Sequence, residues 1–327
     1  MEQGTKSGFS FSSTAEDVTK GVDASGLTAI VTGATAGIGT ETVRVLALRG
    51  AHVYLTGRTV KCATETMNAI LKKIPHAKLD ILAPLDLSSQ ASVRKCAEGF
   101  LALNQPLNLL INNAGLMMAS HGLTEDGIEV HFGTNHVGHV LLTNLLLEKL
   151  IDTAIKTGIE SRIVILSSEG ISFPAPDPVA WDIDSINEDK GKGASGVSNL
   201  ANIFHAYGIS KLANVYHAQE LTRQLQEKGI TNVTISSVHP GKIFTSLGRQ
   251  GKWIFRFLYL MTFWAWKSIP QGAATTCYVA LHPAVKGVSG KFFVDNNEFD
   301  PKAYNPLAED EQQAKKLWDL SVRLTAT

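Results

Sequence analysis

The stretch "TGATAGIG", Thr32–Gly39, follows directly on the apolar run that begins "LTAIV" and leads into a helical pattern. Glycines let a backbone turn tightly and approach another group without Cβ clashes. The first N–H groups of the following helix attract anions. Strand, glycine turn and helix in this order predict a cradle for a pyrophosphate, whereas glycines alone would indicate a bare turn. The residues expected to form the cradle are Gly33, Thr35, Ala36, Gly37, Ile38 and Gly39.

Outward from this turn, apolar runs alternate with helical patterns along the chain. Val, Ile and Leu occupy consecutive positions in these runs, so both faces of each strand must be covered, as in parallel sheets. We expect an α/β protein with a single Rossmann-type, doubly wound, parallel sheet of seven strands and helices on both faces. The runs after the first are 51–58, 77–87, 107–115, 161–168, 231–241 and 290–297.

Composition limits the classes of function. The chain has 327 residues, 44% of them hydrophobic, and a formal net charge of zero. This balance predicts a large core and no affinity for nucleic acid. Three scattered cysteines indicate neither disulfides nor a metal site, and we expect none. Residues 1–25 form a polar, acid-containing lead-in to a domain at 26–327. The lead-in resembles neither a secretory signal nor a transit peptide, and no transmembrane span is expected.

Residues at the ends of the next strands predict which dinucleotide binds. The second strand ends in "LTGR", and the basic Arg58 favours a 2′-phosphate, hence NADP(H), although Arg58 is alternatively a solvated helix-start residue. Asp86, with Leu87, closes the third strand and either accepts from an adenine amino group or caps a helix. "NNAG", with Asn113, Ala114 and Gly115, is expected to line the cofactor.

The stretch "AYGISKLAN" places Tyr207 and Lys211 on one face of a helix. A nearby ammonium lowers the pKa of a phenol, which would make Tyr207 an acid or base near neutral pH. Ser168, at the end of the fifth strand, is expected to hold the substrate oxygen, with Ser167 as its rival. Asn135 is an unusual residue for the interior of a helix, and we expect it to hold a water that connects Lys211 to solvent.

These motifs, ending with "HPG" at 239–241, together resemble the short-chain dehydrogenase/reductase family over residues 26–297. Segments such as "RIVILSSE" and "YGISKLANVYHAQELTRQL" are similar to the branch of the retinol dehydrogenases and the WW-domain oxidoreductase. They are most similar to plant dehydrogenases related to the Tic complex of the chloroplast envelope. The resemblance implies Tyr207 as general acid/base, Lys211 as its pKa modulator and ribose anchor, and contacts to the nicotinamide half from Pro240, Gly241 and Thr245.

Two segments lie between or after these motifs, and the first is longer than in compact members of the family. Residues 169–206 are rich in Pro, Gly, Ser and Asp, and we expect an irregular loop around the rim of the site. Residues 242–269 are expected to form a substrate lid. Its aromatic part, "WIFRFLYLMTFWAWK" at 253–267, favours a bulky lipophilic substrate, with peripheral membrane contact and a homodimer contact as alternatives. Near its end the chain reads "DEQQAKKLWDLSVRL", which predicts an amphipathic helix docked on the core.

The sequence therefore predicts an NADP(H)-dependent oxidoreductase that interconverts a carbonyl and an alcohol on a lipophilic small molecule. The alternative is an NADPH-binding, redox-sensing partner of a chloroplast-envelope assembly with little turnover. We expect a cytoplasmic or chloroplast-associated protein that is not secreted. Substrate identity and reaction direction have no signature in the sequence.

Overall fold

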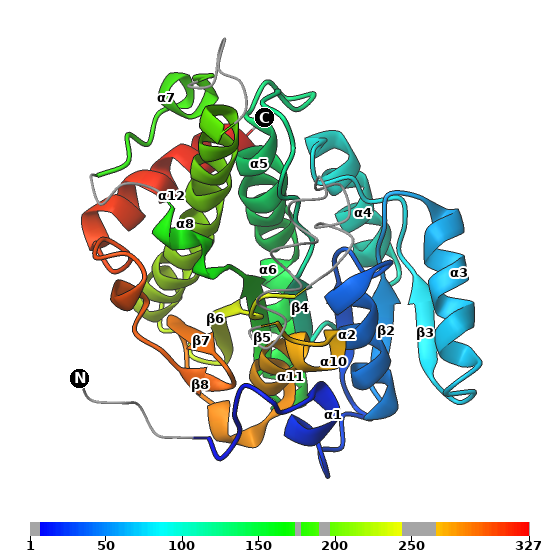
Figure 1. Ribbon diagram of the computed structural model, residues 1–327. Coiled ribbons are helices and arrows are strands. Elements are labelled where there is room, and N and C mark those ends of the chain that lie inside the picture. The colour runs from blue at the N-terminus through cyan, green and yellow to red at the C-terminus, as the bar shows by residue number, and fades with distance from the viewer. Residues whose placement is uncertain (1–6, 174–177, 190–196, 244–265, 327) are drawn as a thin grey trace.

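A computed structural model describes residues 7–173, 178–189, 197–243 and 266–326. Within these ranges the chain forms a sheet of eight strands in the order β3-β2-β1-β4-β5-β6-β7-β8 (Figure 1). The strands are β1 Thr28–Val31, β2 His52–Leu55, β3 Lys78–Ile81, β4 Leu109–Asn112, β5 Ser161–Leu166, β6 Val233–His239, β7 Lys291–Val294 and β8 Asn297–Glu298. The predicted doubly wound α/β fold is confirmed. The sheet has one strand more than the seven predicted. This extra strand, β8, pairs antiparallel with β7 and is too short to leave a sequence pattern.

The order of the strands reverses beside β1. The chain passes from β1 to β2 and β3 on one side, then returns to place β4 on the other side of β1. Both neighbours run parallel to β1. In open parallel sheets the crevice for ligands lies at the carboxyl ends of the strands at this reversal. The glycine turn and the "NNAG" segment follow β1 and β4, so both lie at this crevice.

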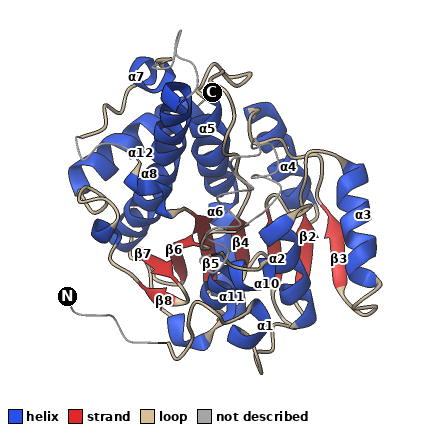
Figure 2. Ribbon diagram, in the orientation of Figure 1, coloured by secondary structure: helices blue, strands red, loops and turns tan. Residues whose placement is uncertain are grey.

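Helices cover both faces of the sheet (Figure 2). One apolar core joins the sheet to α1, α2, α3 and α11, and a second joins the opposite face to α4, α6 and α8. A third core lies between α8 and α12. The helices are α1 Ala15–Val18, α2 Gly37–Leu48, α3 Val60–Leu71, α4 Gln90–Ala102, α5 Val130–Phe132, α6 Gly138–Thr157, α7 Ile183–Asn187, α8 Val197–Glu227, α10 Ile269–Gly272, α11 Ala274–Leu281 and α12 Glu311–Thr325.

The described part of the polar lead-in, residues 7–25, packs on the domain. Ala15 and Val18 of α1 belong to the first core. The Phe11 ring lies 5.0 Å from the Lys267 ammonium, which has no exposed side-chain surface. The lead-in therefore contributes buried contacts to the fold, although its sequence is mostly polar.

The predicted rim loop, 169–206, contains more regular structure than its composition indicates. It includes a 3-10 turn at Glu169–Ser172, the short helix α7 and the first turns of α8, which begins at Val197. The predicted C-terminal helix is confirmed as α12, whose N-terminus is capped by Asp310. Most of the predicted lid, 244–265, lies outside the described residues.

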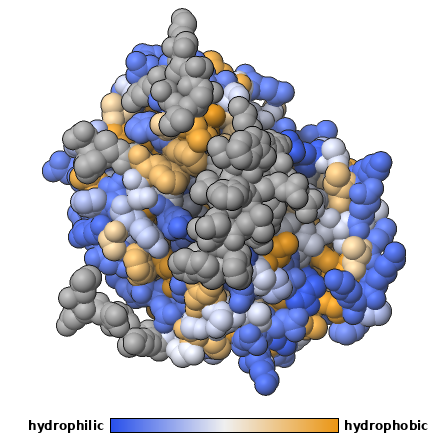
Figure 3. Space-filling view, in the orientation of Figure 1, coloured by the Kyte–Doolittle hydropathy of each residue, from blue (hydrophilic) through white to orange (hydrophobic). Residues whose placement is uncertain are grey.

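The surface over α3 is mostly hydrophilic, with hydrophobic residues between the polar ones (Figure 3). This agrees with the burial in α3, where only Ala63 and Ile70 are fully buried. None of the helices in the described ranges combines the length and the apolar character of a membrane span.

Candidate active site

The turn after β1 leaves no room for side chains at two of its glycines. Gly33 has a φ of +63°, a conformation that favours glycine. A Cβ on Gly39 would lie 2.3 Å from the Gly33 carbonyl oxygen and 2.6 Å from Asn113 Nδ2. The backbones of the turn, of α2 and of the "NNAG" segment therefore approach one another closely. This is the tight cradle that the sequence predicts.

The N-terminus of α2 offers N–H groups to an anion. Ala36 is the N-cap residue, and within the described structure no side chain caps this helix end. The lack of a side-chain cap leaves first-turn amides available for a phosphate, because Ser, Thr, Asp or Asn at this position would otherwise satisfy one. The turn and the helix end together fit a pyrophosphate.

Arg58 is exposed and follows β2 near the same turn. Its neighbour Gly57 packs against the turn, since a Cβ there would lie 2.6 Å from Thr35 Cγ2. The backbone at 57–58 is therefore placed beside the phosphate cradle. This position is the one from which a basic side chain meets a 2′-phosphate.

The "NNAG" segment is tied to the turn by hydrogen bonds. The backbone N–H groups of Asn113 and Ala114 donate to Thr32 Oγ1 at 2.8 and 2.9 Å, and Asn113 Nδ2 donates to the Thr32 carbonyl oxygen at 2.7 Å. Asp86 lies at the end of the segment after β3, where its Oδ1 accepts from the backbone and the hydroxyl of Ser88. The turn at Ser88 thus occupies one carboxylate oxygen of Asp86, and the neighbouring Leu87 is buried.

Tyr207 and Ser168 meet at the carboxyl edge of the sheet. Tyr207 lies on α8, and Ser168 follows β5 as the N-cap residue of the 3-10 turn. Burial raises the pKa of the Tyr207 phenol, and a hydrogen bond with Ser168 acts in the opposite direction. Desolvation thus outweighs the lowering effect that the sequence predicts from Lys211.

Lys211 lies one helical turn after Tyr207, with its Nζ 5.8 Å from the centre of the phenol ring. Its ammonium donates to the Leu166 carbonyl oxygen at 3.0 Å. Burial lowers the pKa of Lys211 to about 8. A Cβ on Gly115 would lie 3.3 Å from this ammonium and 3.2 Å from Asn135 Oδ1. Glycine at 115 therefore keeps the space in front of Lys211 open.

The structure separates the two rival serines. Ser167 is buried, and its hydroxyl donates to the Lys211 carbonyl oxygen at 2.7 Å. Ser168 is less buried and faces Tyr207. Ser167 thus holds α8 against β5, while Ser168 is available to a substrate oxygen.

Asn135 lies in a π-helical turn, Gly133–Val137. Such turns are rare and are frequent at functional sites. The Asn135 side chain bonds the backbone N–H and carbonyl of Leu116, and it donates to the Ser210 hydroxyl. These bonds fix Asn135 beside the lysine. Its role as a water holder stays a prediction.

A buried chain of hydrogen bonds joins the glycine turn to α8. Thr32 Oγ1 lies 2.9 Å from His139 Nε2, and His139 Nδ1 donates to the Asn135 carbonyl oxygen at 3.0 Å. Burial lowers the pKa of His139 to about 4, so the ring is neutral. Its Nε2 therefore accepts a hydrogen bond from the Thr32 hydroxyl. Asn214 on α8 donates both to the Asn135 carbonyl and to the Leu166 carbonyl that also binds Lys211. The sequence analysis missed His139 and Asn214, whose only signal is polarity on apolar helix faces.

"HPG" ends β6 at the edge of the crevice. Gly241 has a φ of +89°, and a Cβ there would lie 2.7 Å from Lys267 Cδ. The Lys267 ammonium pairs with Asp295 at 2.5 Å. Pro240 and Gly241 are thus backed by a buried lysine that the sequence analysis missed. Thr245 lies outside the described residues.

A glycine cradle at a helix N-terminus, with a phenol, a hydroxyl and an ammonium beside it, defines a dinucleotide-dependent oxidoreductase. The short chain dehydrogenase family model matches residues 27–178. The chain is 50% identical, over 98% of its length and 95% of the relative's, to the short-chain dehydrogenase TIC 32 B, chloroplastic, of Brassica napus. The chain belongs to the short-chain dehydrogenase/reductase family, and its cofactor is a nicotinamide dinucleotide. The predicted resemblance is confirmed.

Two further comparisons agree with this family. Human retinol dehydrogenase 11 is 38% identical over 94% of this chain and 88% of its own length. A solved structure of an uncharacterized protein from Mycobacterium paratuberculosis superposes with a TM-score of 0.67 at 28% identity, covering 95% of this chain and 97% of that chain.

Proposed function

We propose that the chain is an NADP(H)-dependent oxidoreductase that interconverts a carbonyl and an alcohol on a bulky lipophilic small molecule. The observation that carries the proposal is the meeting of Tyr207, Ser168 and Lys211 at the carboxyl edge of the sheet, beside the phosphate cradle. When bound, the nicotinamide supplies or accepts the hydride.

The residues of this chain handle the oxygen of the substrate. Ser168 binds and orients it, and the Tyr207 hydroxyl gives it a proton or takes one away. A phenol whose pKa is raised is protonated at neutral pH, which is the form that donates. Lys211 keeps a positive charge near the phenol and stabilises its anion.

Replacing Tyr207 by Phe tests this chemistry. We expect kcat to fall by roughly 10²–10⁴-fold, since a positioned general acid contributes that much. NADPH binding, measured by the fluorescence of the reduced cofactor, serves as the control and stays within a few-fold of wild type. Turnover near the wild-type rate would refute the assigned mechanism.

The preference for NADP(H) rests on Arg58, which is exposed beside the turn. We expect Arg58→Ala to raise KM for NADPH by about tenfold, the equivalent of about 1.4 kcal/mol, and to leave KM for NADH unchanged. Equal effects on both cofactors would show that Arg58 does not bind a 2′-phosphate.

A second candidate is a redox-sensing partner of a chloroplast-envelope assembly, favoured by the 50% identity with a chloroplastic relative. Release of the chain from envelope membranes on addition of NADPH would support it. So would the lack of turnover across a broad panel of carbonyl compounds. Membrane and homodimer contacts through 253–267 remain proposals, because 253–265 lie outside the described residues.

A further inference from the structure

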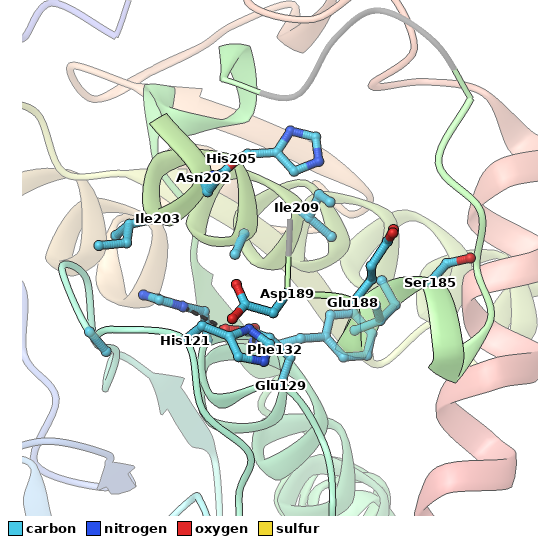
Figure 4. Close-up of a pocket in the computed structure, with 14 residues that line it drawn as sticks. His121, Glu129, Phe132, Ser185, Glu188, Asp189, Asn202, Ile203, His205 and Ile209 are labelled. Atoms are coloured by element: carbon cyan, nitrogen blue, oxygen red, sulfur yellow. Dashed lines mark hydrogen bonds and ion pairs between the residues drawn. The ribbon is translucent and has the colours of Figure 1, made fainter. Parts of the chain in front are cut away.

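A small pocket that is open to solvent lies beside the stretch of α8 that carries Tyr207. Its walls come from residues 119–132, from α7 with the two residues after it, and from the N-terminal half of α8 (Figure 4). Much of the lining is apolar. The apolar side chains are Ala119, Phe132, Ile186, Ile203, Ala206 and Ile209.

One buried polar atom in this lining has no partner. His131 is 1% exposed, and its Nδ1 lies 2.7 Å from Glu129 Oε1. A carboxylate only accepts hydrogen bonds, so Nδ1 is the donor of this pair, and a ring with a single proton presents Nε2 as an acceptor. Among the described residues, Nε2 has no hydrogen-bond partner. A buried acceptor in this state is costly unless a donor reaches it.

The orientation of His131 is fixed by its surroundings. Glu129 Oε2 accepts from the Phe132 backbone N–H at 2.8 Å, and the Glu129 backbone N–H donates to Asn187 Oδ1 at 2.8 Å. These bonds connect the wall that carries His131 to α7. The His, Asp and Glu side chains of the pocket do not form a metal-binding group in the described part of the chain. An unpartnered acceptor of this kind is satisfied by a hydroxyl or amine donor.

The pocket is a direct neighbour of the catalytic phenol. The rings of His131 and Tyr207 meet edge to face with their centres 6.5 Å apart. Ala206, which lines the pocket, precedes Tyr207 on α8. The pocket thus lies next to the Tyr207 ring, while neither Tyr207 nor Ser168 belongs to its lining.

We propose that the pocket receives the far part of the substrate and that His131 Nε2 accepts a hydrogen bond from a hydroxyl group on it. The substrate class is then a lipophilic ketone, or the matching alcohol, that carries a second hydroxyl remote from the reacting oxygen. The apolar walls bind the hydrocarbon part, and the imidazole selects the hydroxylated molecule. This inference rests on the proposed oxidoreductase function and narrows it.

A matched pair of bicyclic ketones, 2-decalone and 6-hydroxy-2-decalone, tests the proposal in NADPH-dependent turnover. We expect KM for the hydroxylated ketone to be lower by roughly three- to tenfold, the worth of one net hydrogen bond. In His131→Phe the ratio of the two KM values should fall to about one. Equal KM values in the wild-type enzyme would overturn the pocket proposal and leave the oxidoreductase function intact.

A second variant keeps the proposal testable if His131→Phe does not fold. Ile203→Trp places a larger side chain in the pocket from α8 and leaves Glu129 and His131 unchanged in sequence, and it should also remove the preference. Ile155→Trp is the matched control, since Ile155 is 67% exposed and lies away from the pocket. If neither ketone turns over, the reaction proposed for this class fails. The affinities of the two ketones for wild type and for His131→Phe, measured by calorimetry, then test the pocket proposal. Tighter binding of the hydroxylated ketone by wild type but not by His131→Phe supports it, and equal affinities in wild type refute it.

Discussion

Replacing Gly39 by Ala should disrupt the phosphate cradle, because the added methyl group has no space. Its carbon would lie 2.3 Å from the Gly33 carbonyl oxygen and 2.6 Å from Asn113 Nδ2, about 1 Å short of an ordinary contact. Both neighbours are held, the first by the backbone and the second by its bond to Thr32. The turn or α2 must therefore shift, and such overpacking costs about 1–3 kcal/mol.

The same substitution at Gly99 is the matched control. Gly99 is an exposed residue within α4, where a Cβ would meet only Leu82 Cδ1 at 3.9 Å. Alanine there should stabilise the protein by about 0.5–1 kcal/mol through helix propensity. Urea unfolding measures both changes, and NADPH fluorescence should show at least about tenfold weaker binding for Gly39→Ala alone. Stability and affinity at wild-type levels in Gly39→Ala would refute the reasoning.

Three further predictions concern Lys211, His217 and the two adjacent serines. The pKa of Lys211 is lowered to about 8, so between about pH 8 and 10.5 the unfolded chain binds more protons than the folded one. The free energy of unfolding should therefore rise with pH across this range. Lys211→Met should remove this rise, as measured by urea unfolding. The pKa of His217 is lowered to about 3, and neither ring nitrogen has a partner in the described structure. His217→Phe should therefore reduce the loss of stability as pH falls from 6.5 towards 3, and an unchanged acid profile would contradict this. Ser168→Ala should lower kcat by at least about tenfold with little change in stability, whereas Ser167→Ala should cost about 1 kcal/mol of stability and spare kcat. The reverse pattern would exchange their roles.

The sequence predicted the parts of the fold that have a clear periodicity. Consecutive apolar residues marked the parallel strands, and glycines marked the turn after β1. β8 is only two residues long, so no pattern precedes it. The start of α8 at Val197 was missed because a Gly- and Ser-rich stretch indicates a loop, while packing against other elements decides otherwise.

The site was predictable to the extent that its residues fall in short motifs. Ser167 and Ser168 were adjacent alternatives, and only the bond from Ser167 to the Lys211 carbonyl separates them. Asn135 stood out as a poor helix former, but the π-helical turn around it depends on tertiary contacts. The Glu129–His131 pair left no sequence signal, because its meaning depends on a pocket built from three distant segments.

The hydrogen bonds from Thr32 through His139, Asn135 and Asn214 bear on any attempt to redesign this enzyme. A foreign nucleotide loop grafted in place of the turn would lose the hydroxyl that His139 needs, and the disturbance would reach the backbone that positions Lys211. Arg58 is exposed and stands outside this series of contacts. We therefore expect a substitution at Arg58 to leave these contacts intact, whereas a transplanted loop would have to be introduced together with His139, Asn135 and Asn214.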